Sequence, residues 1–204
     1  MNASLTLHRH PLSGHCHRVE LMLSLLGLQC TMVDVDLARG QNRKPAFLAI
    51  SPLGQVPVLQ DGELILADSN AILVYLALRY DAAQRYLPRD PVGAAQVQRW
   101  LSLAAGELAY GPGELRRATL FQSPMDREKL ERLSNKLLGL LESTLTTVRY
   151  LTGETLTIAD IAMYTYTAHA PEGGFSLEPY PAVRAWLEHI EGLPGFVPMK
   201  RLSP

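Results

Sequence analysis

The stretch SPLGQVPVLQDGELILADS, residues 51–69, decides the predicted fold. Two short apolar runs flank the turn QDGE, and an Asp-Gly pair between such runs is a strong signal for a β-hairpin. Pro57 stands near the start of the first run, where it indicates an exposed strand edge and is compatible with a cis peptide bond. Asp68 or Ser69 then caps a helix that continues to about Tyr80. We therefore expect strands over residues 56–59 and 64–66, followed by a helix.

The residues before this stretch alternate between strand and helix periods. Residues 4–8 and 30–35 are strand-like, residues 17–28 carry apolar side chains at helical spacing, and residues 45–50 form a short helical turn. This order requires a mixed sheet in which a helix connects the parallel strands. Residues 1–80 therefore predict a small α/β domain.

The pattern changes after residue 80. Residues 81–91 lose periodicity and contain two prolines, so we interpret them as a linker. Gly111-Pro112-Gly113 should break or kink the first helix beyond the linker, because proline removes a backbone donor. Residues 92–204 predict an all-helical domain, with helices over residues 92–110, 126–148, 158–169 and 182–190.

Composition narrows the class of protein. The 204 residues are 47% hydrophobic and 19% charged, which is typical of a globular protein of two small domains. The formal net charge of −1, without a basic stripe, argues against nucleic acid and membrane surfaces as partners. There is no apolar leader or membrane-spanning run, and Cys16 and Cys30 are too few for a disulfide scaffold. We expect a cytoplasmic protein.

The loop Ser13-Gly14-His15-Cys16 leads from the first predicted strand into a helix, whose amino terminus favours negative charge. Ser13 stands where a thioredoxin-type redox loop has its first cysteine. Its hydroxyl cannot exchange disulfides, but it can donate a hydrogen bond to a thiolate brought by a substrate. Two alternatives stay open: Ser13 is a thiolate donor or only an N-cap, and Cys16 is a small apolar residue or a nucleophile with a low pKa.

Two further segments have the chemistry to hold a peptide-like ligand. The backbone of Val56 can pair with an extended peptide, as in strand addition. At the next helix start, the Ser69 hydroxyl and the backbone donors suit a carboxylate, and Asp68 suits an ammonium group. Each segment also has a purely structural interpretation, as an ordinary edge strand and as helix capping.

Four histidines near the amino terminus raise the question of a metal. His8 and His10 straddle the end of a predicted strand, and His15 and His17 would point apart on a helix. No acidic or cysteine partner completes a site at familiar spacing, so no metal is expected. His15 is instead a candidate second donor to the thiolate.

Together, three segments resemble the cytosolic glutathione transferases, most closely bacterial members near the theta and nu types. The segments are SGHCHRVELMLSLLGL, FLAISPLGQVPVLQDGELILADSNAILVYLA and LTIADIAMYTY. The resemblance implies a thioredoxin-like glutathione-binding domain followed by an all-helical domain, in a homodimer. It also implies transfer of the glutathionyl group to a small electrophile, with glutathione as co-substrate.

The resemblance extends to single residues. Ser13 matches the serine that stabilises the glutathione thiolate. Val56 matches the residue whose backbone pairs with the cysteinyl part of glutathione, and Pro57 matches the cis-proline beside it. Asp68 and Ser69 match the pair that holds the γ-glutamyl end, although Glu is more common at the position of Asp68.

The remaining matches concern the other end of glutathione and the helical half. Asn42 and Arg43 fall where related proteins hold the glycyl carboxylate, although His or Gln is more usual at the position of Asn42, and Gln55 belongs to the same binding set. Thr157 and Asp160 match the family's N-capping box, so we interpret Asp160 as a folding element and not as a catalytic acid.

Two other functions stay open beside conjugation. The first is glutathione-dependent reduction of disulfides or peroxides, with Cys16 or glutathione itself carrying the exchange. The second is a binding protein without catalytic activity, because one fold hosts several functions.

Overall fold

The computed structural model describes residues 5–201, which separate into two compact units. Unit 1 comprises the described residues up to 82 together with residues 195–200, and unit 2 comprises residues 83–194 with Arg201. Residues 195–200 thus return to unit 1, although the sequence places everything after residue 91 in the helical half. None of the helices in the described part of the chain is long and apolar enough to cross a membrane.

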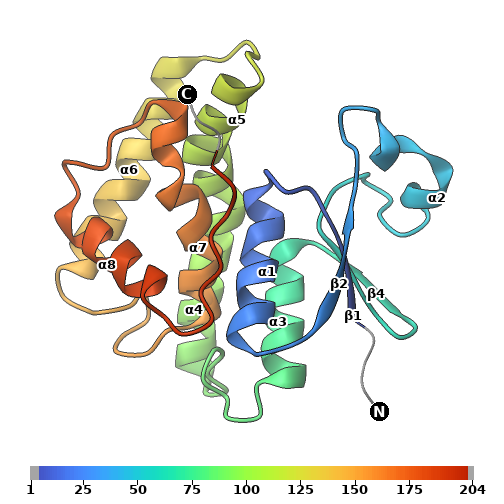
Figure 1. Ribbon diagram of the computed structural model, residues 1–204. Helices are drawn as coiled ribbons and strands as arrows, with labels where there is room; N and C mark the ends of the chain where they lie inside the picture. Colours follow the sequence, from blue (N-terminus) through green and yellow to red (C-terminus); the bar gives the residue numbers. More distant parts are fainter. Residues whose placement is uncertain (1–4, 202–204) are drawn as a thin grey trace. The chain divides into compact units, whose positions relative to one another are not determined.

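Unit 1 is built on a four-stranded mixed sheet in the order β2-β1-β3-β4 (Figure 1). β1 (Leu5–Arg9) runs parallel to β2 (Cys30–Asp34) and antiparallel to β3 (Val58–Asp61). β3 pairs with β4 (Leu64–Ala67) across the predicted hairpin. The mixed sheet of the predicted α/β domain is confirmed; Ser4, the predicted first strand residue, lies outside the described residues.

Two long helices of unit 1 lie side by side on one face of the sheet (Figure 1). α1 (Gly14–Leu25) begins before the predicted residue 17 because Ser13 caps it, and Gly27 ends the helical turn in a left-handed conformation with φ of 67°. α3 (Ser69–Tyr80) begins after Asp68, as the sequence predicts. The apolar faces of these helices therefore form the main core of unit 1 with the sheet.

A smaller core lies under α2 (Pro45–Leu48), which follows the 3-10 turn η1 (Gln41–Arg43). It consists of the buried residues Val35, Phe47 and Val58. This second core anchors η1 and α2 on the sheet.

Unit 2 is helical, with one helix buried along its whole length. That helix is α7, and every one of its residues is buried. In chain order the elements are α4 (Pro91–Leu103), the π-helix η2 (Ala104–Gly113), α5 (Glu114–Leu120), α6 (Arg127–Leu145), α7 (Ile158–Ala168), the 3-10 turn η3 (Ala170–Gly173) and α8 (Pro181–Glu191).

The chain stays helical through Gly111-Pro112-Gly113, where the sequence predicts a break or kink. The helix widens into π turns instead, which accommodates a proline that an α-helical interior would reject. A Cβ atom at Gly113 would lie 3.1 Å from the Leu108 carbonyl oxygen and 3.3 Å from the Tyr166 ring. The glycine therefore serves close packing.

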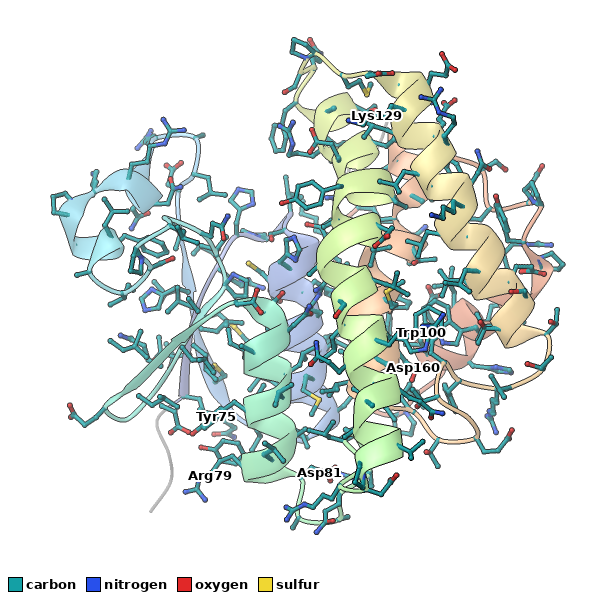
Figure 2. All side chains as sticks on the ribbon, turned by 180° about the vertical axis from the view of Figure 1, so that it is seen from behind. Tyr75, Arg79, Asp81, Trp100, Lys129 and Asp160 are labelled. Atoms are coloured by element: carbon teal, nitrogen blue, oxygen red, sulfur yellow. The ribbon has the colours of Figure 1, made fainter. Side chains whose placement is uncertain are left out.

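Asp160 forms the predicted capping box at the start of α7. Its Oδ1 accepts hydrogen bonds from Leu151 N–H at 2.9 Å and Trp186 Nε1 at 3.0 Å. Its Oδ2 accepts from Thr157 N–H at 2.9 Å and from the Thr157 hydroxyl at 3.2 Å. Trp100 Nε1 donates to the Leu151 carbonyl oxygen, which extends this buried network to α4 (Figure 2). Asp160 is thus a folding element, as the sequence indicates.

Candidate functional site

The sheet register brings three predicted segments to one end of unit 1. His8 on β1 pairs with Val58 on β3, and Val58 pairs with Ala67 on β4. The chain leaves the sheet just beyond this row in all three places. The segments concerned are residues 10–13, 55–57 and 68–69.

Ser13 is the N-cap of α1. Its Oγ accepts a hydrogen bond from Cys16 N–H at 3.3 Å, and its carbonyl oxygen accepts from Cys16 and His17 N–H groups at 3.1 and 2.9 Å. The side chain is half-buried, and its hydroxyl also hydrogen-bonds the Cys16 side chain, which lowers the pKa of that thiol, although burial outweighs this effect. A hydroxyl donates one hydrogen bond and accepts two. Ser13 therefore caps the helix, and its hydroxyl can turn from the neutral Cys16 thiol, which is a weak acceptor, to a thiolate at a helix terminus whose dipole favours an anion.

Cys16 is fully buried in the first turn of α1. Its Sγ accepts a hydrogen bond from His10 N–H at 3.3 Å. Burial raises the pKa of the Cys16 thiol to about 11. These features fit the small apolar residue among the two alternatives for Cys16, and they are the reverse of what an exposed, low-pKa nucleophile requires.

Ser69 begins α3 and is linked to α1 by side chains. Its Oγ accepts a hydrogen bond from Arg18 Nη1 at 3.3 Å and lies 3.4 Å from His15 Nδ1. Burial, followed by the charge of Arg18, lowers the pKa of His15 to about 3. His15 is therefore a neutral polar group at pH 7, and the structure places it against Ser69.

Arg18 is a site residue that the sequence analysis missed. It is fully buried, and its Nη1 also donates to Asn70 Oδ1 at 2.8 Å. The available signal was an arginine within an otherwise apolar helical pattern, beside Val19. Buried arginine is uncommon without polar partners, so its position predicts a polar neighbour from another element.

Asp68 caps α3 with one of its two carboxylate oxygens. Oδ1 accepts hydrogen bonds from Asn70 and Ala71 N–H groups, both at 2.9 Å. The side chain is exposed, which leaves Oδ2 open to a ligand. The Asp68 backbone has a φ of 74°, a conformation that costs a non-glycine residue about 1–3 kcal/mol and is concentrated at functional positions.

The Val56–Pro57 peptide bond is cis, which the sequence indicated. β3 begins at Val58 and not at the predicted Val56, because Pro57 has no N–H group for the ladder. No hydrogen bond to the Val56 backbone is found among the described residues. The backbone groups of this half-buried residue are therefore available to an extended ligand.

Two polar side chains hold the loop before the cis proline. The buried Ser51 donates from Oγ to the Gln55 carbonyl oxygen at 2.9 Å and accepts from Gln55 N–H at 3.1 Å. Asn42 Nδ2, from η1, donates to the Gly54 carbonyl oxygen at 2.7 Å. The Asn42 amide thus positions the loop, whereas the Arg43 side chain is exposed to solvent.

The amino-terminal histidines are used in packing. His8 Nε2 lies 3.0 Å from Gln60 Oε1, and His17 Nε2 lies 2.8 Å from the Val197 carbonyl oxygen. Across residues 5–201, no group of three or more His, Cys, Asp or Glu side chains is arranged to hold a metal ion.

Unit 1 is thus a thioredoxin-like domain with a serine-capped loop, a cis proline and a second capped helix, and unit 2 is helical. The family model described as "Glutathione S-transferase, N-terminal domain" matches residues 3–78, and "Glutathione S-transferase, C-terminal domain" matches residues 100–194. The chain belongs to the glutathione S-transferase family.

Individual relatives agree with this assignment. The chain is 31% identical to "Glutathione S-transferase 3" of Zea mays over 95% of its own length and 92% of that protein. It is 36% identical to the crystal structure of a glutathione S-transferase from Pseudomonas fluorescens, with a TM-score of 0.90 and coverage of 96% and 98%. A possible glutathione S-transferase from Rhodopseudomonas palustris is 34% identical, with a TM-score of 0.87 and coverage of 98% and 99%. These relatives support a transferase in a family that uses glutathione as substrate.

Proposed function

We propose that the protein transfers the glutathionyl group to small electrophiles and that Ser13 stabilises the glutathione thiolate. The observation that carries the proposal is the common row of the sheet, His8, Val58 and Ala67. It brings the Ser13 hydroxyl, a segment whose backbone is unpaired among the described residues, and a capped helix start to one end of unit 1. These are the three groups that a γ-glutamyl tripeptide with a reactive thiol requires.

The chemical step needs the thiolate, because the thiolate and not the thiol is the nucleophile. An unperturbed cysteine thiol has a pKa of about 8.5, so most of it is protonated at neutral pH. A hydrogen bond to a charged acceptor contributes about 1.5–3 kcal/mol, which lowers a pKa by about one to two units. Ser13 supplies this bond, the thiol proton passes to solvent, and the sulfur then forms a bond to the electrophilic carbon as the leaving group departs.

The remaining groups hold the peptide. Val56 pairs its backbone with the cysteinyl part, beside Pro57, and Gln55 flanks this segment. Asp68 accepts from the γ-glutamyl ammonium through its open Oδ2, and Ser69, backed by the Arg18 charge, takes the carboxylate. At the glycyl end Arg43 contacts the carboxylate, and Asn42 contributes by holding the loop.

The position of Cys16 disfavours a cysteine-based redox enzyme. A buried thiol whose pKa is raised to about 11 is a poor nucleophile at neutral pH. We therefore propose a serine-type enzyme of the bacterial theta or nu kind. Two free cysteines fit a reducing cytoplasm.

We also propose a homodimer. Unit 1 exposes five large aliphatic side chains among its described residues, three of which are Leu48 on α2, Leu53 at 82% and Leu78 at 53% exposure. The other two, Leu64 and Ile65, lie on β4, an edge strand of the sheet. A second copy that covers these side chains would remove their apolar surface from water, which accounts for their exposure in the single chain. Light scattering tests this, and a monomer mass at micromolar concentration would contradict it.

A calorimetric titration with reduced glutathione, followed by an assay with a chlorodinitrobenzene, tests the main proposal. Binding together with conjugate formation is the expected result. Disulfide reduction that is lost in Cys16→Ser would instead indicate the redox alternative. Absence of glutathione binding would indicate a binding protein for another ligand.

A further inference from the structure

Unit 1 includes a short segment from the far end of the sequence. Residues 195–200, which we call the strap, follow the last helix of unit 2 but belong to unit 1. Figure 1 draws the strap in dark red beside α1, where it runs from the carboxyl end of that helix toward the amino end. The strap therefore approaches the end of α1 that Ser13 caps.

Two contacts with α1 fix the course of the strap. Gly195 lies against the last turn of the helix, where a Cβ atom on it would be 3.2 Å from the Ser24 carbonyl oxygen. Its φ of 87° is a left-handed conformation that favours glycine. Two residues later, the Val197 carbonyl oxygen lies 2.8 Å from Nε2 of His17, in the first turn. The strap is thus antiparallel to α1, and the next anchor along it, Met199, is buried.

His17 joins the strap to the N-cap of α1. The residue is buried, with 2% of its surface exposed. A carbonyl oxygen only accepts hydrogen bonds, so His17 Nε2 carries the proton and donates to Val197. The backbone N–H of His17 donates to the Ser13 carbonyl oxygen at 2.9 Å. One residue therefore connects the strap with the residue proposed to stabilise the thiolate.

The neighbouring residue holds α1 to a different element. Arg18 Nη1 donates to Ser69 Oγ at 3.3 Å and to Asn70 Oδ1 at 2.8 Å, and both acceptors lie on α3. Consecutive residues of a helix point about 100° apart, so His17 and Arg18 restrain the start of α1 in two directions. Loss of the His17 bond would remove one of these restraints.

The placement of the Ser13 hydroxyl is sensitive to such restraints because its own cap contact is long. Ser13 Oγ accepts from Cys16 N–H at 3.3 Å, whereas such bonds usually measure about 2.7–3.2 Å. A group that stabilises a transition state has to be held within about 0.5 Å of its productive position. A misplacement of about 1 Å can lower a rate about a hundredfold. The turn that carries Ser13 must therefore be held firmly.

We propose that His17 is a positioning residue for thiolate stabilisation, and that it acts by tying the turn that carries Ser13 to the strap. Because His17 is buried, it acts through Ser13 and not by direct contact with glutathione. The role of His17 rests on the proposed function of Ser13, and it adds residues 195–200 to the parts of the chain that determine activity.

Two substitutions of His17 in the full chain test this role through the pKa of the bound glutathione thiol. Thiolate absorbance is followed across pH with protein in excess, so that a partly unfolded sample still reports bound glutathione. His17→Phe removes the donor and keeps a planar ring. We expect it to raise the pKa of the bound thiol by about half a unit or more and to lower kcat about fivefold to tenfold. His17→Gln keeps a side-chain donor and should recover at least about half of both losses.

Tyr75→Phe is the matched control for the loss of one hydrogen bond. The Tyr75 hydroxyl donates to Asp61 Oδ2 at 2.7 Å, and Asp61 ends β3 at the opposite end from Val58. We expect Tyr75→Phe to leave the pKa of the bound thiol unchanged and kcat within about twofold.

A change in the strap tests the same link from its other side. Gly195→Ala places a Cβ atom against Ser24 and leaves His17 intact. It should raise the pKa of the bound thiol in the wild-type background and add little to His17→Phe, because both changes act on one contact. Gly62→Ala is the control and should not change this pKa. Gly62 also has a positive φ, and among the described residues no atom lies within 4 Å of its Cβ position.

Three results would overturn the role of His17: an unchanged pKa of the bound thiol in His17→Phe, no recovery in His17→Gln, or additive effects of His17→Phe and Gly195→Ala. If His17→Phe does not fold, equal effects of Gly195→Ala and Gly62→Ala would overturn it. If Ser13→Ala raises this pKa and His17→Phe does not, the role of His17 alone fails. If wild type does not bind glutathione, or Ser13→Ala leaves the pKa unchanged, the proposed function fails and the role of His17 fails with it.

Discussion

The amino termini of α1 and α7 are both capped by a hydroxyl residue, yet they differ in how completely the cap is used. At α7, the Thr157 and Asp160 side chains are buried, and Asp160 accepts four hydrogen bonds. At α1, Ser13 is half-buried and its Oγ accepts one hydrogen bond at 3.3 Å. A carboxylate that already accepts four hydrogen bonds has nothing left for a ligand, whereas the Ser13 hydroxyl, whose partner is the weakly accepting Cys16 thiol, can donate to one.

The difference separates a folding element from a site. Both sequences satisfy the rules for an N-cap, and capping alone contributes about 1 kcal/mol in each case. What distinguishes them is the surrounding structure. Around Asp160 it supplies a donor from Trp186 and another from the Leu151 backbone, and around Ser13 it supplies the Cys16 thiol, a weak acceptor.

Removing the saturated cap should have the largest effect. Asp160→Ala leaves buried donors without an acceptor, so we expect the free energy of unfolding to fall by about 3–5 kcal/mol. Denaturant titration measures this change. Asp126→Ala is the matched control, because Asp126 caps α6 at the surface and its loss should cost about 1 kcal/mol. If the two variants lost similar free energies of unfolding, the hydrogen bonds of Asp160 would not distinguish it from an ordinary surface cap.

Ser13→Ala should have a large effect on activity and a small effect on stability, the reverse of what we expect for Asp160→Ala. We expect kcat/KM for conjugation to fall about tenfold to a hundredfold, because a hydrogen bond to a charged sulfur is lost. The free energy of unfolding should fall by about 1 kcal/mol or less. Thr157→Ala sharpens the contrast, since it should lower stability and leave kcat/KM of the folded enzyme within about twofold. A Ser13 variant that loses stability but keeps activity would make Ser13 only a cap.

The first turn of α1 also carries a half-buried neutral base, His15, whose pKa is lowered from 6.5 to about 3. Above pH 6.5 this group is neutral in both states and contributes nothing. Between pH 6.5 and 3 the unfolded chain takes up a proton that the folded chain cannot, so falling pH destabilises the fold by about 1.4 kcal/mol per unit.

His15→Gln should therefore flatten the loss of stability in that pH window, measured by urea unfolding between pH 4 and 7. The exposed His189→Gln on α8 is the control and should leave the slope as it is. Parallel stability curves for wild type and His15→Gln would show that His15 is not held neutral.

Asn42→Ala should have the smallest effect, because it removes one hydrogen bond from a loop. Net hydrogen-bond contributions of about 1 kcal/mol predict a rise in KM for glutathione of about fivefold with little change in kcat. Arg43→Gln should raise KM more strongly at low salt than at high salt, as expected of a direct charge contact. If Asn42→Ala shows that same salt dependence, Asn42 contacts the carboxylate itself.

Local sequence patterns predict most of the secondary structure because the relevant physics is local. The Asp-Gly hairpin, the Asp68 cap and the capping box of α7 each depend on a few consecutive residues. The π turns at η2 were not predicted, because the sequence rule for an internal proline indicates a break or kink and does not say how the helix accommodates Pro112.

The residues of the candidate site likewise fall into those that local sequence predicts and those that depend on tertiary contacts. Ser13 and Pro57 follow from residue type and position, and the family resemblance adds their roles. Arg18 and the Asn42–Gly54 hydrogen bond join residues far apart in the sequence, so a pattern search along the chain does not reveal them. Whether a cap is saturated is likewise a property of tertiary neighbours.

The most direct test of the central claim is the pKa of the glutathione thiol when it is bound to the protein. Thiolate absorbance followed across pH measures it in wild type and in Ser13→Ala. Our account predicts a pKa about one to two units below the free value in wild type, and a return toward about 8.5 in Ser13→Ala. An equally low pKa in both proteins would contradict the account and show that another group stabilises the thiolate.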